Sequence, residues 1–283
     1  VTIPKKYPAD ILENKNFVIG FDPKLYTESM LARLFKGSKT RLISINDNLV
    51  DKIWKRNLKS NSRKFYKLKD SDSGQKSQKK IKLISKLIDK KNIDYQFITS
   101  SENISWLLNL RSENSEFTPI IEGYALISKN SKLYFFCEKK KINNNFKKKL
   151  KNVLIIDVKH INKFLKKLEN KKIQIDTNSC SIFFQRLINK NNNIISKKDP
   201  IYFIKSIKNK TEIKNIVKSH EYDGAALTKF LIWLKKNYKN KKISEIDAEQ
   251  KLLKFRKKIK TFKSLSFPTI SGTGPNSAII HYK

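Results

Sequence analysis

Cysteine is scarce in this chain of 283 residues: Cys137 and Cys180 are the only two. Their wide separation gives none of the short spacings that are typical of zinc sites. Both stand in or beside apolar segments, so we interpret them as buried small hydrophobic residues in a protein of a reducing compartment.

Long hydrophobic runs are also missing, since no apolar stretch approaches the about 20 residues that a membrane span needs. No signal peptide is visible either. These absences predict a cytoplasmic protein that does not enter a membrane. The chain starts with Val1, not methionine, and it stops shortly after an expected strand. We therefore expect a fragment of a longer protein.

Acidic residues are few compared with basic ones, and the formal net charge is +37. Such a charge suggests nucleic-acid binding. However, lysine supplies nearly all of it, whereas arginine, which favours bidentate phosphate and base contacts, is rare. The lysines are spread along the whole chain among many asparagines and isoleucines. We therefore interpret them as a solvated surface and expect no nucleic-acid partner, with a non-catalytic nucleic-acid-binding protein as the alternative.

Residues 1–75 are expected to form the first part of an α/β fold. Apolar runs predict strands over 16–21 and 40–45, and helical spacing predicts a helix over 25–35. A short amphipathic piece follows over 48–54. Residues 55–78 lose hydrophobicity and carry turn residues, which indicates an exposed segment with a domain boundary near residue 75.

Residues 76–198 repeat the alternation of strands and helices, and this predicts a complete second α/β domain. Ser100 or Ser101 is a candidate N-cap for a short helix that carries Trp106. Strands are expected over 93–99, 123–128, 132–137, 153–157, 172–176 and 194–195, and helices over 79–88, 161–168 and 179–188.

Residues 199–283 change character. Asp199-Pro200 opens a helical segment, and periodic apolar residues predict a long helix over 210–238. His220 and Gly224 lie on its apolar stripe, so we expect a buried histidine and a close approach by another element. A second helix is expected over 244–259, with Ser244 and Asp247 as a capping box.

The last residues, 267–283, combine a turn sequence with an expected strand. Gly272, Gly274 and Asn276 tolerate positive φ, so the loop over 271–276 is tight. The strand over 277–282 places His281 at its end. Among the three histidines, His160 is interpreted as a surface residue, and His281 is the candidate for chemistry. No pair of carboxylates beside a histidine suggests a metal site in these residues.

The segment Leu265–Tyr282 resembles the entry to the catalytic domain of the Xaa-Pro aminopeptidases, a family of "pita-bread" metallopeptidases. Three further stretches in the expected order resemble this family in its long, three-domain form. They are Ile201–Glu212 with His220–Leu227 and Phe230–Leu234, then Glu102–Arg111, and finally Asn16–Tyr26 with Asn48–Trp54.

The resemblance implies an α/β fold, with α+β character in the C-terminal part. Residues 1–75 would be part of a first creatinase-type domain, 76–198 a second one, and 199–283 the truncated start of the pita-bread domain. It also implies removal of the N-terminal residue from peptides that have proline in second position. Two metal ions, usually manganese, would be the cofactor, and a homodimer the expected assembly.

At the position of His281 the family has a histidine that binds substrate and assists the transition state. The family's metal ligands follow this histidine strand and would lie beyond Lys283, so the resemblance implies that this chain alone is inactive. Ser112 and Asn114 stand where the family usually has glycine and aspartate. A creatinase-like hydrolase that needs no metal is a second enzymatic alternative.

Overall fold

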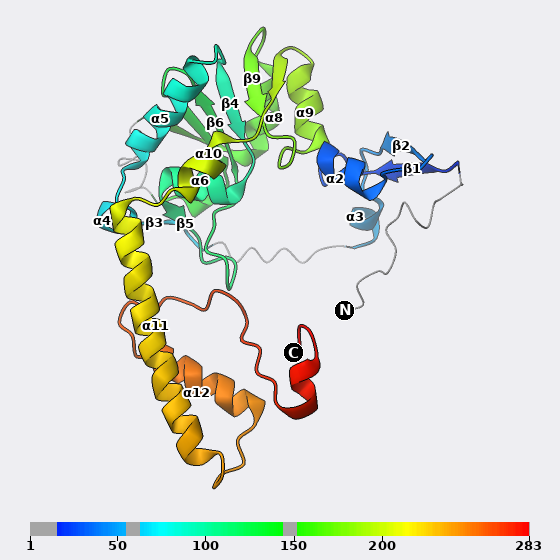
Figure 1. Ribbon diagram of the computed structural model, residues 1–283. Helices are drawn as coiled ribbons and strands as arrows, with labels where there is room; N and C mark the ends of the chain where they lie inside the picture. Colours follow the sequence, from blue (N-terminus) through cyan, green and yellow to red (C-terminus); the bar gives the residue numbers. More distant parts are fainter. Residues whose placement is uncertain (1–15, 55–62, 144–151, 283) are drawn as a thin grey trace. The chain divides into compact units, whose positions relative to one another are not determined.

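The computed structural model describes residues 16–54, 63–143 and 152–282 (Figure 1). The chain divides into two compact units. Unit 1 comprises Val1–Leu68, Gln75–Ser112 and Ile120–Ile207, and unit 2 comprises Lys69–Gly74, Glu113–Pro119 and Lys208–Lys283. The expected boundaries near residues 75 and 198 subdivide the chain differently, and they stay predictions.

The first described elements of unit 1 are a small βαβα arrangement. The strands β1 (Val18–Phe21) and β2 (Arg41–Ser44) pair in parallel, and α2 (Glu28–Leu34) connects them. The hydroxyl of Thr27 accepts a hydrogen bond from the amide of Met30 and caps α2. The helix α3 (Leu49–Ile53) follows, as the amphipathic pattern predicts. Residues 55–62 of the expected exposed segment lie outside the described residues.

A six-stranded sheet is the centre of unit 1. Its strands are β4 (Tyr95–Ile98), β6 (Tyr124–Ser128), β7 (Leu133–Cys137), β8 (Val153–Asp157), β9 (Lys172–Ile175) and β10 (Asn193–Ser196). They stand in the order β10-β9-β4-β6-β7-β8, and β6 runs antiparallel to both of its neighbours while the other pairs are parallel. The predicted α/β fold and all six strands are confirmed.

Helices cover both faces of this sheet (Figure 1). One core cluster includes Ile84 of α5 (Ser77–Asp89), Leu107 of α6 (Ser101–Leu108) and Phe135 of β7. The other cluster joins α8 (Ile161–Lys166) and α9 (Ile182–Asn189) to Phe97 and Phe136. Because neighbouring residues of a strand point to opposite faces, Phe135 and Phe136 enter different cores.

Several short elements complete unit 1. The strands β3 (Tyr66–Lys67) and β5 (Leu110–Arg111) form an antiparallel pair. Two 3-10 helices, η1 (Lys139–Lys141) and η2 (Val158–His160), follow β7 and β8. The helix α10 (Pro200–Ser206) begins at its cap Asp199, as Asp199-Pro200 predicts.

Both cysteines are buried and carry free thiols, which confirms their interpretation as small hydrophobic residues. Burial raises the pKa of each thiol to about 12. Ser100 is the N-cap of α6 and accepts from the amide of Asn103, so the cap prediction is confirmed as well. His160 is exposed, as expected.

The regular elements in the described part of unit 2 are all helices. They are α4 (Asp70–Ser73), α11 (Lys210–Asn237), α12 (Glu245–Lys257) and the 3-10 helix η3 (Gly274–Ala278). Both predicted long helices are present, and Ser244 with Asp247 forms the predicted capping box. Among the described helices, none is both long enough and apolar enough to cross a membrane.

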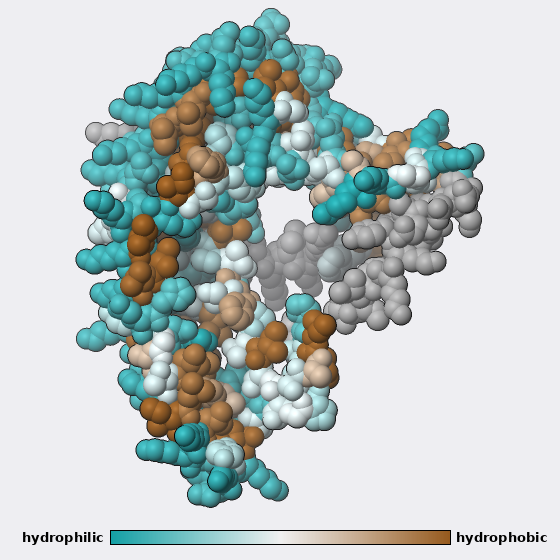
Figure 2. Space-filling model, viewed as in Figure 1, coloured by the Kyte–Doolittle hydropathy of each residue, from teal (hydrophilic) through white to brown (hydrophobic). Residues whose placement is uncertain are grey.

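Two expectations about α11 are wrong. His220 is exposed, and Gly224 has no heavy atom within 4 Å of the position where a side chain would begin. Within the described part of unit 2, α12 is the one long helix that packs against α11, so most of the apolar stripe stays open to solvent (Figure 2). Ile213, Ile216, Val217 and Leu231 are between 44% and 52% exposed.

Candidate functional site

The start of α11 is fixed by its own side chains and by α4. Asn209 and Glu212 form a capping box, which satisfies two amides that the helix leaves free. The side-chain amides of Asn209 and Asn215 also donate to the carbonyl oxygens of Ser73 and Asp72, at 2.9 and 3.0 Å. The first two turns of the helix therefore have a defined place within unit 2.

A forked ion pair joins α11 to α12. The guanidinium of Arg256 donates from Nε to Oδ1 of Asp223 at 2.6 Å and from its terminal nitrogen to Oδ2 at 3.0 Å. The side chain of Arg256 is 22% exposed and that of Asp223 is 50% exposed. Such a two-point contact fixes the relative rotation of the helices better than a single contact could.

His220 and Asp223 line a cavity of about 710 Å³ beside this ion pair. The cavity wall also includes Arg256 and apolar residues of the segment after α12, among them Phe262 and Phe267. His220 and Asp223 are three residues apart, so they stand on one face of α11. The sequence did not point to Arg256, which lies 33 residues after Asp223.

The tight loop before η3 is held by one carboxylate. Oε1 of Glu245 accepts the amide of Thr273 at 2.6 Å and the side-chain amide of Asn276 at 3.1 Å. These donors, first the Thr273 amide and then Tyr282 and Asn276, hold the pKa of Glu245 below its ordinary value. Glu245 was not singled out from the sequence, because an acidic residue in the first turn of a helix is common there.

The expected strand over 277–282 is not formed. Residues 274–278 adopt the 3-10 helix η3, closed by bonds such as Ile279 N to Asn276 O at 3.1 Å. The described residues of unit 2 offer no strand with which this segment could pair, so its backbone groups bond locally instead.

His281 is exposed and has a φ of 56°, in the left-handed region that favours turns. It lies three residues after the end of η3 and is not among the residues that line the cavity with His220. The structure thus keeps the two histidines of unit 2 at separate places. The role expected for His281 stays a prediction.

No group of three or more His, Cys, Asp or Glu side chains in residues 16–54, 63–143 and 152–282 could hold a metal ion. His220 and Asp223 supply two candidate ligands, and Arg256 already occupies both oxygens of the Asp223 carboxylate. The described residues therefore do not fit a two-metal centre, and we derive no chemical step through metal ions.

Two family models match the chain. The Creatinase/Prolidase N-terminal domain matches residues 56–212, and Metallopeptidase family M24 matches residues 214–283. The first covers more than half of the chain.

Similar proteins carry consistent names. The chain is 32% identical to "Probable Xaa-Pro aminopeptidase P" of Laccaria bicolor, over 94% of this chain and 43% of that protein. It is 31% identical to the protein of the same name from Paracoccidioides lutzii, over 99% and 48%. The chain thus spans less than half the length of these curated relatives.

Among similar solved structures is one that matches this chain over its full length. It is the X-prolyl aminopeptidase of Caenorhabditis elegans, described as a cytosolic enzyme with a di-nuclear active site. It has a TM-score of 0.87 and 25% sequence identity, and it covers 100% of this chain and 48% of its own.

Proposed function

The chain belongs to the creatinase/prolidase N-terminal domain family, and from this membership we propose that it is part of a metal-dependent Xaa-Pro aminopeptidase. The substrate would be a peptide with proline in second position, from which the enzyme hydrolyses the N-terminal residue. One observation carries this proposal: a solved X-prolyl aminopeptidase matches this chain over its full length at a TM-score of 0.87.

The proposal assigns a part to each region. Residues 1–75 and 76–198 would be creatinase-type domains, and 199–283 the start of the catalytic domain. The M24 match over residues 214–283 supports the last assignment. We further propose a cytoplasmic location, in line with the description of the similar enzyme as cytosolic.

We propose two metal ions as the cofactor of the longer enzyme, with manganese as our candidate. The di-nuclear site named for the similar enzyme supports the number of ions, and the choice of manganese is our proposal. The ligands would come from chain beyond Lys283. We therefore expect the 283-residue chain to have no peptidase activity of its own. A homodimer is the proposed assembly of the longer enzyme.

His281 is the proposed substrate-binding and catalytic residue of this segment. Its exposed position, three residues after the end of η3, is compatible with this role. In the longer enzyme it would contact the substrate and stabilise or protonate the transition state.

Replacement of this histidine tests the assignment. We expect His281→Ala in the longer enzyme to lower kcat about 100-fold, because general acid–base groups contribute on this scale. The bound metal, measured by atomic absorption, should stay unchanged. Loss of metal would instead make His281 a ligand, and unchanged turnover would remove it from the site. His160→Ala is the matched control, since His160 is exposed in unit 1.

A further inference from the structure

A second cavity lies in unit 1, at one edge of the six-stranded sheet. The strands β4 and β7 both end at this edge, and the antiparallel strand β6 begins there. On one side of β4 stand β9 and β10, and on the other stand β6, β7 and β8. The cavity therefore lies at the ends of β4, β6 and β7, where the chain leaves or enters these strands.

The cavity has a volume of about 340 Å³. This is at the small end of the range of roughly 300 to 1,000 Å³ for ligand pockets, so the cavity suits a small molecule. The polar groups that line it come from the ends of the strands and the first turns after them. They belong to Thr99, Ser101, Glu122, Tyr124, Glu138 and Lys141.

A buried ammonium group provides the positive charge of this cavity. The side chain of Lys141 is only 6% exposed, and its Nζ donates to Oε2 of Glu122 at 2.7 Å and contacts Oε1 of Glu138 at 3.2 Å. An ammonium has three hydrogens to donate. Within the described part of the chain, these two carboxylates are the partners of Lys141, so one hydrogen remains for a ligand.

The two carboxylates have unused capacity as well. Each carboxylate can accept about four hydrogen bonds. The side chain of Glu122 is 70% exposed, so its second oxygen can turn towards a ligand. Glu138 also pairs through Oε2 with Lys140 at 3.1 Å, so the exposed carboxylate of Glu122 is the acceptor that is most open to a ligand.

Two hydroxyl groups complete the cavity. The ring of Tyr124 is fixed against Phe97 and Phe184, with centroid distances of 6.2 and 4.8 Å. Ser101 is the first residue of α6. Neither hydroxyl bonds to another residue within 16–54, 63–143 or 152–282, and both line the cavity, so they are available to a ligand.

We propose that this cavity binds a small zwitterion, namely a free α-amino acid. The carboxylate of the ligand would accept from Lys141 and from the hydroxyl of Ser101. Its ammonium would donate to Glu122 and Glu138. The hydroxyl of Tyr124 would form a hydrogen bond with either the carboxylate or the ammonium of the ligand. The proposal is independent of the peptidase activity, because all of these residues lie in unit 1 and none has a proposed part in hydrolysis.

Isothermal titration of the 283-residue chain tests the proposal directly. The probes are glycine, alanine and proline, with acetate and ethylamine as ligands that carry only one of the two charges. We expect at least one amino acid to bind with a Kd below about 1 mM, and both singly charged probes to bind about tenfold more weakly or not at all. Equal binding of acetate or ethylamine would contradict the proposal, and so would the lack of saturation by all three amino acids at about 10 mM.

Variants that keep the fold locate the site. Glu122→Gln changes an exposed group, and Tyr124→Phe keeps the ring contacts, so both proteins should fold. Each should weaken amino-acid binding about tenfold, because the first removes the charge that faces the ligand's ammonium and the second removes a hydroxyl that bonds to a charged group. Glu169→Gln is the matched control at an exposed carboxylate outside the cavity and should bind normally. Unchanged affinity in both cavity variants would place any binding elsewhere and overturn the proposal.

Discussion

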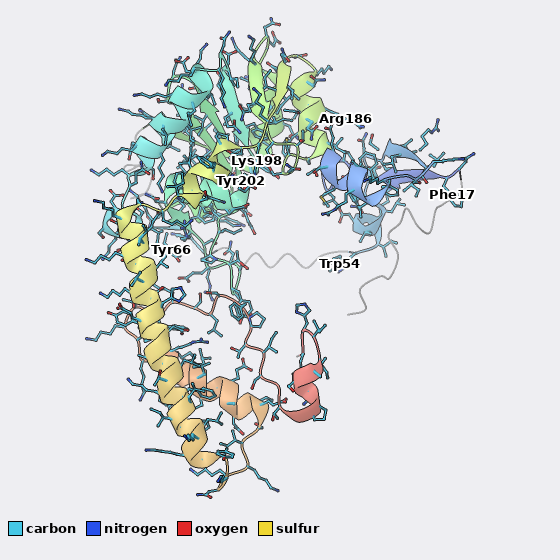
Figure 3. All side chains as sticks on the ribbon, viewed as in Figure 1. Phe17, Trp54, Tyr66, Arg186, Lys198 and Tyr202 are labelled. Atoms are coloured by element: carbon cyan, nitrogen blue, oxygen red, sulfur yellow. The ribbon has the colours of Figure 1, made fainter. Side chains whose placement is uncertain are left out.

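Asp199 is a buried carboxyl group on which the start of α10 depends. Only 3% of this residue is exposed. Its oxygens accept from the amide of Ile201 at 3.0 Å and from the side-chain amide of Asn103 at 2.7 Å, and the nearby Tyr202 and Lys198 mark its position in Figure 3. The sequence predicts the cap from Asp199-Pro200. It does not reveal the burial or Asn103, because 96 residues separate the two partners.

The charge of this group predicts a pH dependence of stability. Burial, the largest cause, raises the pKa of Asp199 from 3.8 to about 6. The native state therefore gains a proton near pH 6, whereas the unfolded chain gains it near pH 4. The stabilisation by this proton is fully present below pH 4 and is lost as the pH rises through 6. Two pKa units correspond to roughly 3 kcal/mol in the free energy of unfolding.

Asp199→Asn should remove this dependence. Asn is also a good N-cap, and the amide of Asn103 can rotate so that its oxygen accepts from the new side chain. Hydrogen exchange of the β4 and β9 amides at pH 4.5 and 7 reports on unit 1 alone. We expect the variant to lack the extra protection that this proton gives the wild type at pH 4.5, while Glu169→Gln keeps it. If protection from exchange depended on pH in the same way in Asp199→Asn and in the wild type, Asp199 would not be the group that causes this dependence.

Lys80 is a second buried charge, and its role is structural. Its Nζ donates to the carbonyl oxygen of Trp106 at 2.8 Å and to Oδ1 of Asn109 at 2.7 Å, and it lies 4.0 Å from the centre of the Trp106 ring. These contacts join α5 to the end of α6. We expect Lys80→Met to lower the free energy of unfolding by about 3 kcal/mol, since it leaves buried acceptors without a partner.

The matched control for Lys80 is its exposed neighbour Lys82. Lys82→Met should change stability by less than about 0.5 kcal/mol, as is usual for surface positions. Both variants are compared with the wild type by hydrogen exchange of the α5 amides, measured at increasing concentrations of urea. Equal effects of the two substitutions would mean that the buried contacts of Lys80 do not contribute to the free energy of unfolding.

At the scale of elements, the periodicity of apolar residues predicted the type and position of most helices and strands well. It predicted poorly which of their side chains are buried. The helix expected over 210–238 is α11 at Lys210–Asn237, since its apolar spacing and cap residues act locally. The burial of its stripe depends on what packs against it, and the described part of unit 2 supplies α12 for a part of its length. The expected strand over 277–282 is wrong for a related reason, because a strand needs a neighbour to bond with.

The contact between α11 and α12 can be tested through Asp223. Asp223→Asn removes the charge that faces Arg256, and the partial exposure of the pair limits its contribution to about 1 kcal/mol. We expect amide exchange in α12 to become roughly fivefold faster, which corresponds to that free energy. The control is Glu221→Gln, two residues earlier and exposed. Unchanged exchange in α12 would show that apolar contacts alone join the helices.

At the scale of the whole molecule, the order of several motifs predicted more than any one residue did. The segments around Trp106, His220 and Leu265 are each ordinary when taken alone. In sequence order they indicate one family, and the matches over residues 56–212 and 214–283 confirm that reading. The candidate site could be predicted only in part, because the proposed active centre needs groups that the described residues do not bring together.

Steady-state hydrolysis by the protein extended past Lys283 tests the central claim most directly. Two matched peptides, one with proline and one with alanine in second position, are assayed with manganese. The proposed function predicts rapid release of the N-terminal residue from the proline peptide alone, abolished by a chelator, and no turnover by the 283-residue chain. Equal hydrolysis of both peptides, or activity that survives metal removal, would contradict it.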